Sequence, residues 1–157
     1  MPYVAIVPYA DRIYANAYWD DRLANSAWSA ATDDNKDRAL KQATTVIDTL
    51  DFVGYKTSET QVRQFPRNDD TDVPDEVLQA TCEIAAVLLS GTTLDSVVGG
   101  KAGIASESIG DASVSYTGAG RAGAFLSATL GTLSPVAARL LAPWLRDEDS
   151  IRVDRVS

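Results

Sequence analysis

The stretch DDNKDRALKQATTVIDTLDF, residues 33–52, carries the clearest helical pattern in this chain. Its apolar residues recur every three or four positions, which places them on one face of a helix: Ala39, Leu40, Ala43, Val46, Ile47 and Leu50. Thr32 is a suitable N-cap, and Asp33 and Asp34 favour the positive end of the helix dipole. Gly54 is a suitable stop. The pattern predicts an amphipathic helix that packs its apolar face against other helices.

The segments on either side of this helix predict further helices. Residues 10–30 predict one or two short helices with Asp11 as a cap, and the polar residues 54–73 predict a loop. Pro74 stands where a first helical residue belongs and opens a second amphipathic helix that ends near Gly91. A last short helix is predicted to begin at Ser134 and Pro135, to continue through Leu140, Leu141 and Trp144, and to break at Pro143.

Between the second and last helices, residues 112–117 alternate in polarity, which is typical of an extended strand. We therefore expect a mainly α protein, a small helical bundle with an extended strand or arm inserted before a C-terminal helix. We expect a single domain over residues 1–157, with a helical core at about 10–92, the extended arm at about 104–123, and the C-terminal helix and tail at about 134–157.

The charge balance bears on the class of partner. With 14 Lys and Arg against 22 Asp and Glu, the 157-residue chain has a formal net charge of −8. A phosphate backbone is repelled overall, because affinity for nucleic acids depends on basic groups that displace condensed counterions. Its cationic residues are scattered among acids and predict no basic patch. The apolar stretches are much shorter than the roughly 20 residues needed to span a bilayer, so we expect no membrane association.

Catalytic chemistry is not indicated. The chain lacks histidine, the usual general base at neutral pH, and its single cysteine, Cys82, lies within an apolar helix where we expect it to be inert. The acidic run at 68–76 lacks the turn glycine and final glutamate of a calcium loop. GAGRAG, residues 118–123, has dinucleotide-binding spacing, but too little chain follows to complete that fold, and we interpret it as a glycine hinge. We expect no enzyme activity, catalytic residue, cofactor or metal.

The aromatic residues near the N-terminus allow two interpretations. They are Tyr9, Tyr14, Tyr18, Trp19 and Trp28. Such rings can stack on single-stranded bases of any sequence. Their helical spacing and their acidic neighbours favour packing in the core and at interfaces instead.

One arrangement of segments covers almost the whole chain. In order it contains YADRIYANAYWDDRLANSAW, KDRALKQATTVIDTLDFVGYK, QVRQFPR, VPDEVLQATCEIAAVLL, ESIGDASVSY and LLAPWL. This arrangement resembles the small head–tail connector, or adaptor, proteins of tailed bacteriophages. Some relatives of this type are labelled as DnaT-like single-stranded-DNA-binding proteins. Arg63 departs from the resemblance, because an aliphatic residue is expected there.

The resemblance implies a structural protein of the virion neck, made and assembled in the host cytoplasm. Such adaptors are mostly helical and assemble as a ring, typically of twelve subunits, beneath the portal protein. The implied partners are other copies of the chain, the portal protein and a tail or stopper protein. DNA is expected to pass through the channel without specific binding. The alternative function is that of a single-stranded nucleic-acid-binding accessory protein.

Residue roles follow within the connector interpretation. A structural loop motif is expected from Gln61, Phe65, Pro66 and Arg67. In this motif Phe65 and Pro66 anchor the loop on the helices, and Arg67 pairs with the acids of 69–76 or with an adjacent subunit. The candidate subunit or portal contacts are Ile109, Val114, Tyr116, Trp144, Ile151 and Val153.

Overall fold

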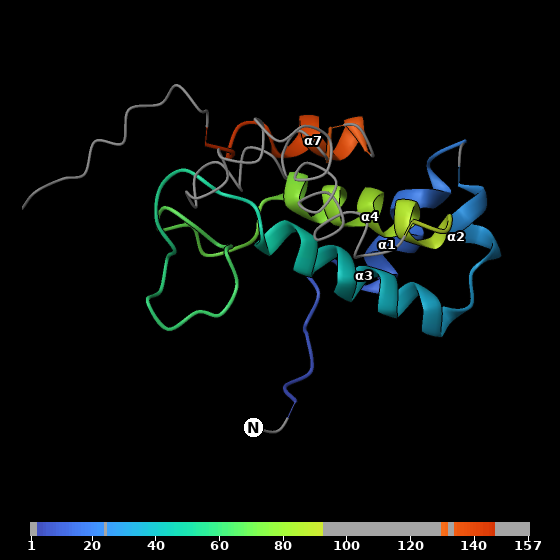
Figure 1. The fold of residues 1–157 in the computed structure, drawn as a ribbon, viewed down its shortest axis with the longest axis horizontal. Helices are drawn as coiled ribbons and strands as arrows, with labels where there is room; N and C mark the ends of the chain where they lie inside the picture. Colours follow the sequence, from blue (N-terminus) through green and yellow to red (C-terminus); the bar gives the residue numbers. More distant parts are fainter. Residues whose placement is uncertain (1–2, 24, 93–129, 132–133, 147–157) are drawn as a thin grey trace, which may run out of the picture.

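The structure is a computed structural model that describes residues 3–23, 25–92, 130–131 and 134–146. The predicted arm at 104–123, with the GAGRAG segment, and the tail from residue 147 lie outside the described residues. The described residues form a mainly helical domain, as predicted. Their β-type pairing is confined to two isolated bridges. The helices are α1 (Arg12–Asp20), α2 (Ser26–Ala30), α3 (Asp33–Asp48), α4 (Asp75–Leu89) and α7 (Pro135–Leu141). Figure 1 shows α3, α4 and α7 side by side, with α1 and α2 at one end.

Helix α3 begins as the sequence predicts. The Thr32 hydroxyl accepts a hydrogen bond from the Asn35 amide at 3.2 Å, and the two aspartates lie in the first turn. The helix ends at Asp48, four residues earlier than predicted. Thr49 then caps it through a hydroxyl bond to the Val46 carbonyl, while Leu50 stays buried beyond the helix end. Gly54, with a φ of 80°, makes the left-handed turn that follows.

The region before α3 forms two short helices, which confirms the prediction for residues 10–30. Asp11 caps α1 by accepting from the Tyr14 amide at 2.8 Å. The indole nitrogen of Trp28, in α2, donates to the side chain of Asn16, in α1, at 2.9 Å. This bond ties the two short helices together and lets the Trp28 ring remain buried.

Helix α4 is the centre of the bundle. It packs against α3 and α7 and also touches α1 and α2. Its buried residues include two alanines, Ala80 and Ala85, whose small side chains allow neighbouring helices to approach closely. Pro74 occupies the N-cap and the helix begins at Asp75, one residue later than predicted. This position suits Pro74, which has no amide hydrogen to leave unpaired.

Helix α7 begins at Pro135, and the Ser134 hydroxyl accepts from the Ala137 amide. It ends at Leu141, so the predicted continuation through Trp144 is wrong. Pro143 explains the early end, because it has no amide hydrogen to continue the helical hydrogen-bond pattern, although Ala142 before it is still in helical geometry. The chain then runs beside the segment after α3: the Val53 amide donates to the Trp144 carbonyl at 2.8 Å, and the Arg146 amide donates to the Asp51 carbonyl at 3.0 Å.

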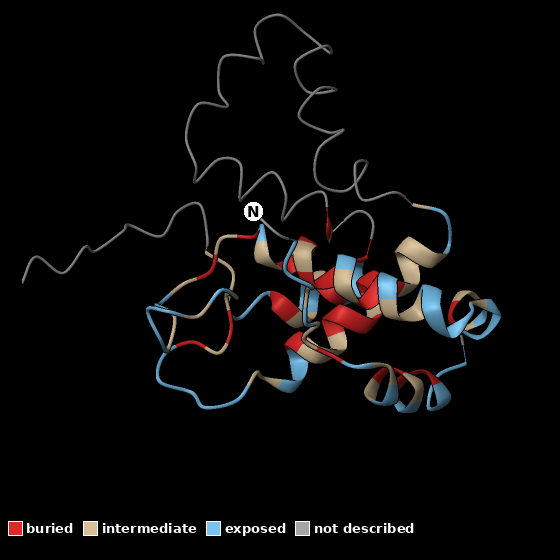
Figure 2. Cartoon of the chain, turned by 90° about the horizontal axis from the view of Figure 1, so that it is seen from below, coloured by how far each residue is buried: buried red, intermediate tan, exposed pale blue. Residues whose placement is uncertain are grey.

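The core lies along the facing sides of the helices. Figure 2 shows buried positions on their inward faces and exposed positions on their outward faces. The largest fully buried apolar side chains are Leu40, Ile47, Val77, Ile84, Leu130 and Leu141. Among the helices described, none is long and apolar enough to cross a membrane.

Candidate functional site

The predicted loop motif is built around Phe65. Its ring is 2% exposed and makes edge-on contacts with Phe52, Tyr9 and Trp144, with ring centroids 4.8, 6.1 and 6.2 Å away. The following peptide bond, to Pro66, is cis. The cluster joins the N-terminal segment, the loop and the residues after α7. Phe65 thus lies where these three segments meet.

Arg67 turns into the protein and does not pair with the acids of 69–76. Its guanidinium donates to the carbonyl oxygens of Val53 at 3.1 Å and Gly54 at 2.8 Å, and to the side-chain oxygen of Gln64 at 2.9 Å. Longer bonds reach the carbonyls of Phe52 and Gln64. Burial lowers the pKa of Arg67, and the five acceptors replace the water that burial removes.

Gln61 closes the other side of the same loop. Its amide nitrogen donates to the carbonyls of Arg63 and Pro66, each at 2.9 Å, and its amide oxygen accepts from the Ser58 amide. Gln61, Phe65 and Arg67 therefore all make contacts within one loop. They perform internal structural work.

Asp48, at the end of α3, connects the loop to the N-terminal segment. Its carboxylate accepts from the Tyr9 hydroxyl, from Arg63 at 2.7 Å and from the Gln64 amide at 3.2 Å. Burial and then the Asp48 carboxylate raise the pKa of Tyr9. Arg63, the residue that departs from the connector resemblance, thus provides the positive charge that neutralises a half-buried carboxylate.

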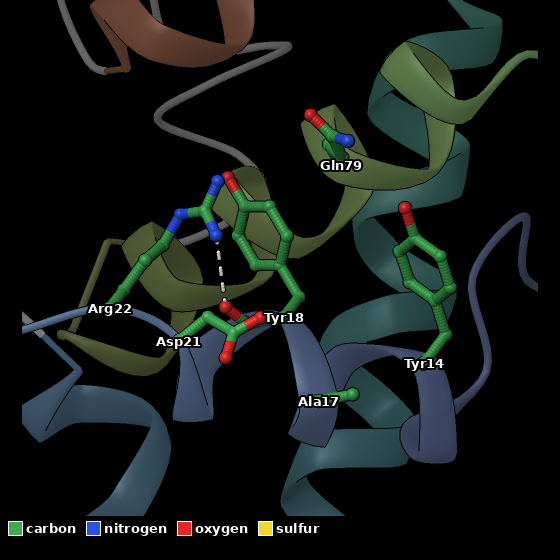
Figure 3. Close-up of a pocket in the computed structure, with 6 residues that line it drawn as sticks. All are labelled: Tyr14, Ala17, Tyr18, Asp21, Arg22 and Gln79. Carbon is green, nitrogen blue, oxygen red and sulfur yellow. Dashed lines mark hydrogen bonds between the residues drawn. The ribbon is translucent and has the colours of Figure 1, made fainter.

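A groove of about 280 Å³ lies between α1 and α4. Its lining, drawn in Figure 3, consists of Tyr14, Ala17, Tyr18, Asp21, Arg22 and Gln79. The Arg22 guanidinium lies 3.4 Å from the centre of the Tyr18 ring and donates to the Tyr18 carbonyl. The Tyr18 hydroxyl donates to Glu83, which also pairs with Arg22 at 3.8 Å. Burial, followed by the Glu83 hydrogen bond, raises the pKa of Tyr18.

The structure separates the two interpretations of the N-terminal aromatic residues. Tyr18, Trp19 and Trp28 are 7%, 5% and 3% exposed, so their rings pack in the core and are not free to stack on bases. Tyr9 packs edge-on against Phe65, and Tyr14 is half-buried in the groove. Packing is therefore confirmed for the three buried rings.

Most of the described arginines are neutralised within the chain. The four ion-paired arginines and their partners are Arg12 with Asp33 and Asp37, Arg22 with Glu83, Arg63 with Asp48, and Arg146 with Asp51. Arg67 is buried against carbonyl oxygens. The more exposed of these pairs stabilise a fold little, but all four leave fewer cations for a phosphate backbone.

Trp144 is the one predicted contact residue that falls within the described part of the chain. It is half-buried and packs on Phe65. The other five, Ile109, Val114, Tyr116, Ile151 and Val153, lie outside the described residues. Cys82 is fully buried, and burial, with Glu83 second, raises the pKa of its thiol to about 12. Among residues that the structure describes, no group of three Cys, Asp or Glu side chains is placed to hold a metal ion.

A sequence model described as "Putative DnaT-like ssDNA binding protein" matches residues 8–156. The chain belongs to this family. The match agrees with the DnaT-like label that some connector-type relatives have. Its description favours single-stranded DNA binding over the connector function. No curated protein and no solved structure matches the chain.

Two features of this DnaT-like protein escaped prediction from the sequence. Asp48 collects partners from residues 9, 63 and 64, and nothing in the local sequence indicates that convergence. The second feature is the segment Tyr3–Val7, whose side chains at 3, 4 and 7 are more than 70% exposed. A signal for it was present, because five consecutive uncharged apolar residues are unusual on a surface.

Proposed function

We propose that this DnaT-like family member is a structural, non-enzymatic subunit of the virion neck. In this function, copies of the chain form a ring beneath the portal protein and join it to a tail or stopper protein. The observation that carries the proposal is the internal neutralisation of the arginines Arg12, Arg22, Arg63 and Arg146. The biological setting comes from the resemblance of the sequence segments, in their order along the chain, to head–tail connectors.

In a connector, the wall of the channel must let DNA slide past it. A protein that binds DNA releases counterions in proportion to the phosphates that its cations neutralise. Here four arginines are paired with carboxylates, a fifth is buried, and the net charge is −8. Such a surface attracts a phosphate backbone weakly, and this suits a conduit in which DNA does not adhere.

The family description favours a second candidate function, single-stranded DNA binding. Of the aromatic side chains that the structure describes, Tyr3 and Tyr55 are exposed enough to stack on bases, at 81% and 56%. Their surroundings differ, since Tyr55 donates to Asp69 at 2.7 Å and Tyr3 belongs to an uncharged segment. A binding function would therefore depend on stacking more than on phosphate contacts.

Binding and assembly of the full chain separate the two functions. Fluorescence anisotropy with a labelled oligothymidylate, at 50 and 200 mM salt, measures DNA affinity. Electron microscopy of the protein, alone and with the portal protein, detects rings. The connector function predicts rings, or portal-dependent assembly, with DNA affinity weaker than about 10 μM at 200 mM salt. Tight DNA binding by a protein that assembles in neither setting would replace the connector with the second candidate.

A further inference from the structure

The α1–α4 groove combines aromatic, amide and charged side chains. Tyr14, Ala17, Tyr18 and Asp21 recur at intervals of three or four residues, so they form one stripe along α1 and its C-cap. Figure 3 shows Ala17 between the two tyrosines and Gln79, from α4, on the facing wall. Ala17 is exposed, and its small side chain leaves the space above it open. The groove, at about 280 Å³, therefore has room for one long side chain of another molecule.

The charges at this groove do not balance. Arg22 pairs with Glu83 at 3.8 Å. The exposed carboxylate of Asp21 lines the same groove, and no ion pair to it occurs among the residues that the structure describes. Two carboxylates against one guanidinium leave one negative charge uncompensated. The whole chain, with its net charge of −8, also attracts a cationic partner.

The position of Asp21 costs helix α1 stability. Asp20 ends this helix and Asp21 caps it, and the last turn contains no basic residue. Carboxylates at this end are disfavoured because the helix dipole is negative there. The Arg22 guanidinium offsets part of this cost by donating to the Tyr18 carbonyl at 3.0 Å. Residues that break a local rule in this way are expected at functional sites.

Arg22 indicates which cation suits the groove. Its guanidinium lies 3.4 Å from the centre of the Tyr18 ring. A guanidinium stacks well on such rings and is more weakly hydrated than an ammonium group. Ala17 and Asp21 lie about 6 Å apart along the helix axis. A second arginine side chain can therefore rest its methylene groups on Ala17 and Tyr14 and pair its guanidinium with the Asp21 carboxylate.

We propose that the α1–α4 groove binds an arginine side chain that a partner protein presents. Asp21 and Glu83 then face two guanidinium groups, that of Arg22 and that of the partner, and the charges at the groove balance. The uncompensated carboxylate also disfavours a phosphate group in the same place. One such contact is weak, so it selects the partner and its orientation and adds to a larger interface. The site requires an arginine on the partner and does not depend on the proposed ring.

Titration of the isotope-labelled full chain with the peptide acetyl-Gly-Arg-Gly-amide, followed by NMR, tests the site. The control peptide carries citrulline, which has the shape of arginine without its charge. We expect saturating shifts of the backbone amides of residues 14–22 and 79, with half-saturation at about 1–10 mM peptide. The citrulline peptide should give no saturation over the same range.

A pair of matched variants locates the site. Asp21→Asn keeps the side-chain shape and should weaken binding about tenfold, because it removes the charge-assisted hydrogen bonds. Asp20→Asn removes the same charge from the neighbouring exposed residue, which does not line the groove, and should weaken binding less than about twofold. Because both side chains are exposed, both variants should fold as the wild type does.

Equal weakening by the two variants assigns the binding to the net charge of the chain and overturns the site. Saturating shifts confined to other residues, or no saturating shifts, overturn it as well. Equal binding of the citrulline peptide overturns the requirement for a guanidinium. Putrescine that binds in the groove as tightly as the arginine peptide overturns the choice of a protein side chain.

Discussion

Replacing Arg67 with methionine tests whether the loop is held by its buried guanidinium. The change keeps most of the side-chain volume, so the loss is electrostatic and does not come from a cavity. It removes five hydrogen bonds, two of which reach the carbonyls of Phe52 and Val53 beside the aromatic cluster. Hydrogen bonds to a charged group contribute about 1.5–3 kcal/mol each, but water rehydrates the exposed acceptors, such as that of Gly54. The free energy of unfolding should fall by about 3–5 kcal/mol.

Urea denaturation followed by circular dichroism measures this loss. With a slope of about 1–2 kcal/mol per molar urea, the midpoint should shift by about 1.5–5 M. Arg67→Lys keeps the charge but not the planar fork, and should lose about half as much. The control is Arg38→Met, because Arg38 is exposed and bonds only to Asn35 among the described residues. The reasoning is refuted if Arg67→Met unfolds within 1 kcal/mol of the wild type.

Three further predictions concern the bundle. Because burial raises the pKa of Cys82 to about 12 and also raises those of Tyr9 and Tyr18, the folded state retains protons that the unfolded state releases at alkaline pH. In urea titrations, the free energy of unfolding should therefore be highest below pH 9 and should decline above it. In Cys82→Ala this decline should be shallower by about 1.4 kcal/mol per pH unit between pH 9 and 12. An unchanged slope would contradict this. Asp11→Ala removes the α1 cap and should cost about 1 kcal/mol by thermal denaturation, whereas Asp11→Asn should retain most of the cap. Ile47→Ala, at a fully buried position, should cost about 2–5 kcal/mol in urea, and a loss below 1 kcal/mol would contradict its place in the core.

Local sequence patterns predicted the helices well, because a helix depends on contacts between residues three or four apart. Thr32 and Asp11 cap the helices that the sequence assigned to them. The predicted helix ends were less accurate. Helix α3 stops at Asp48 because the chain turns to pair Phe52 with Leu145, and that pairing is absent from any local window. Helix α7 stops two residues before Pro143.

Composition and periodicity were enough to predict the helical class, the caps, the net negative charge and the burial of Cys82. Tertiary structure alone decided what the polar side chains do. Arg67 sits a few residues before a run of acids, yet it turns to carbonyls that lie 13 to 15 residues away. Asp48 accepts hydrogen bonds from Tyr9 and from Arg63, which lie far from it in the sequence on opposite sides. Arg146 donates to the Phe52 carbonyl across 94 residues. A buried polar group must take whichever partners the fold brings within about 3 Å, and chain order does not specify those partners.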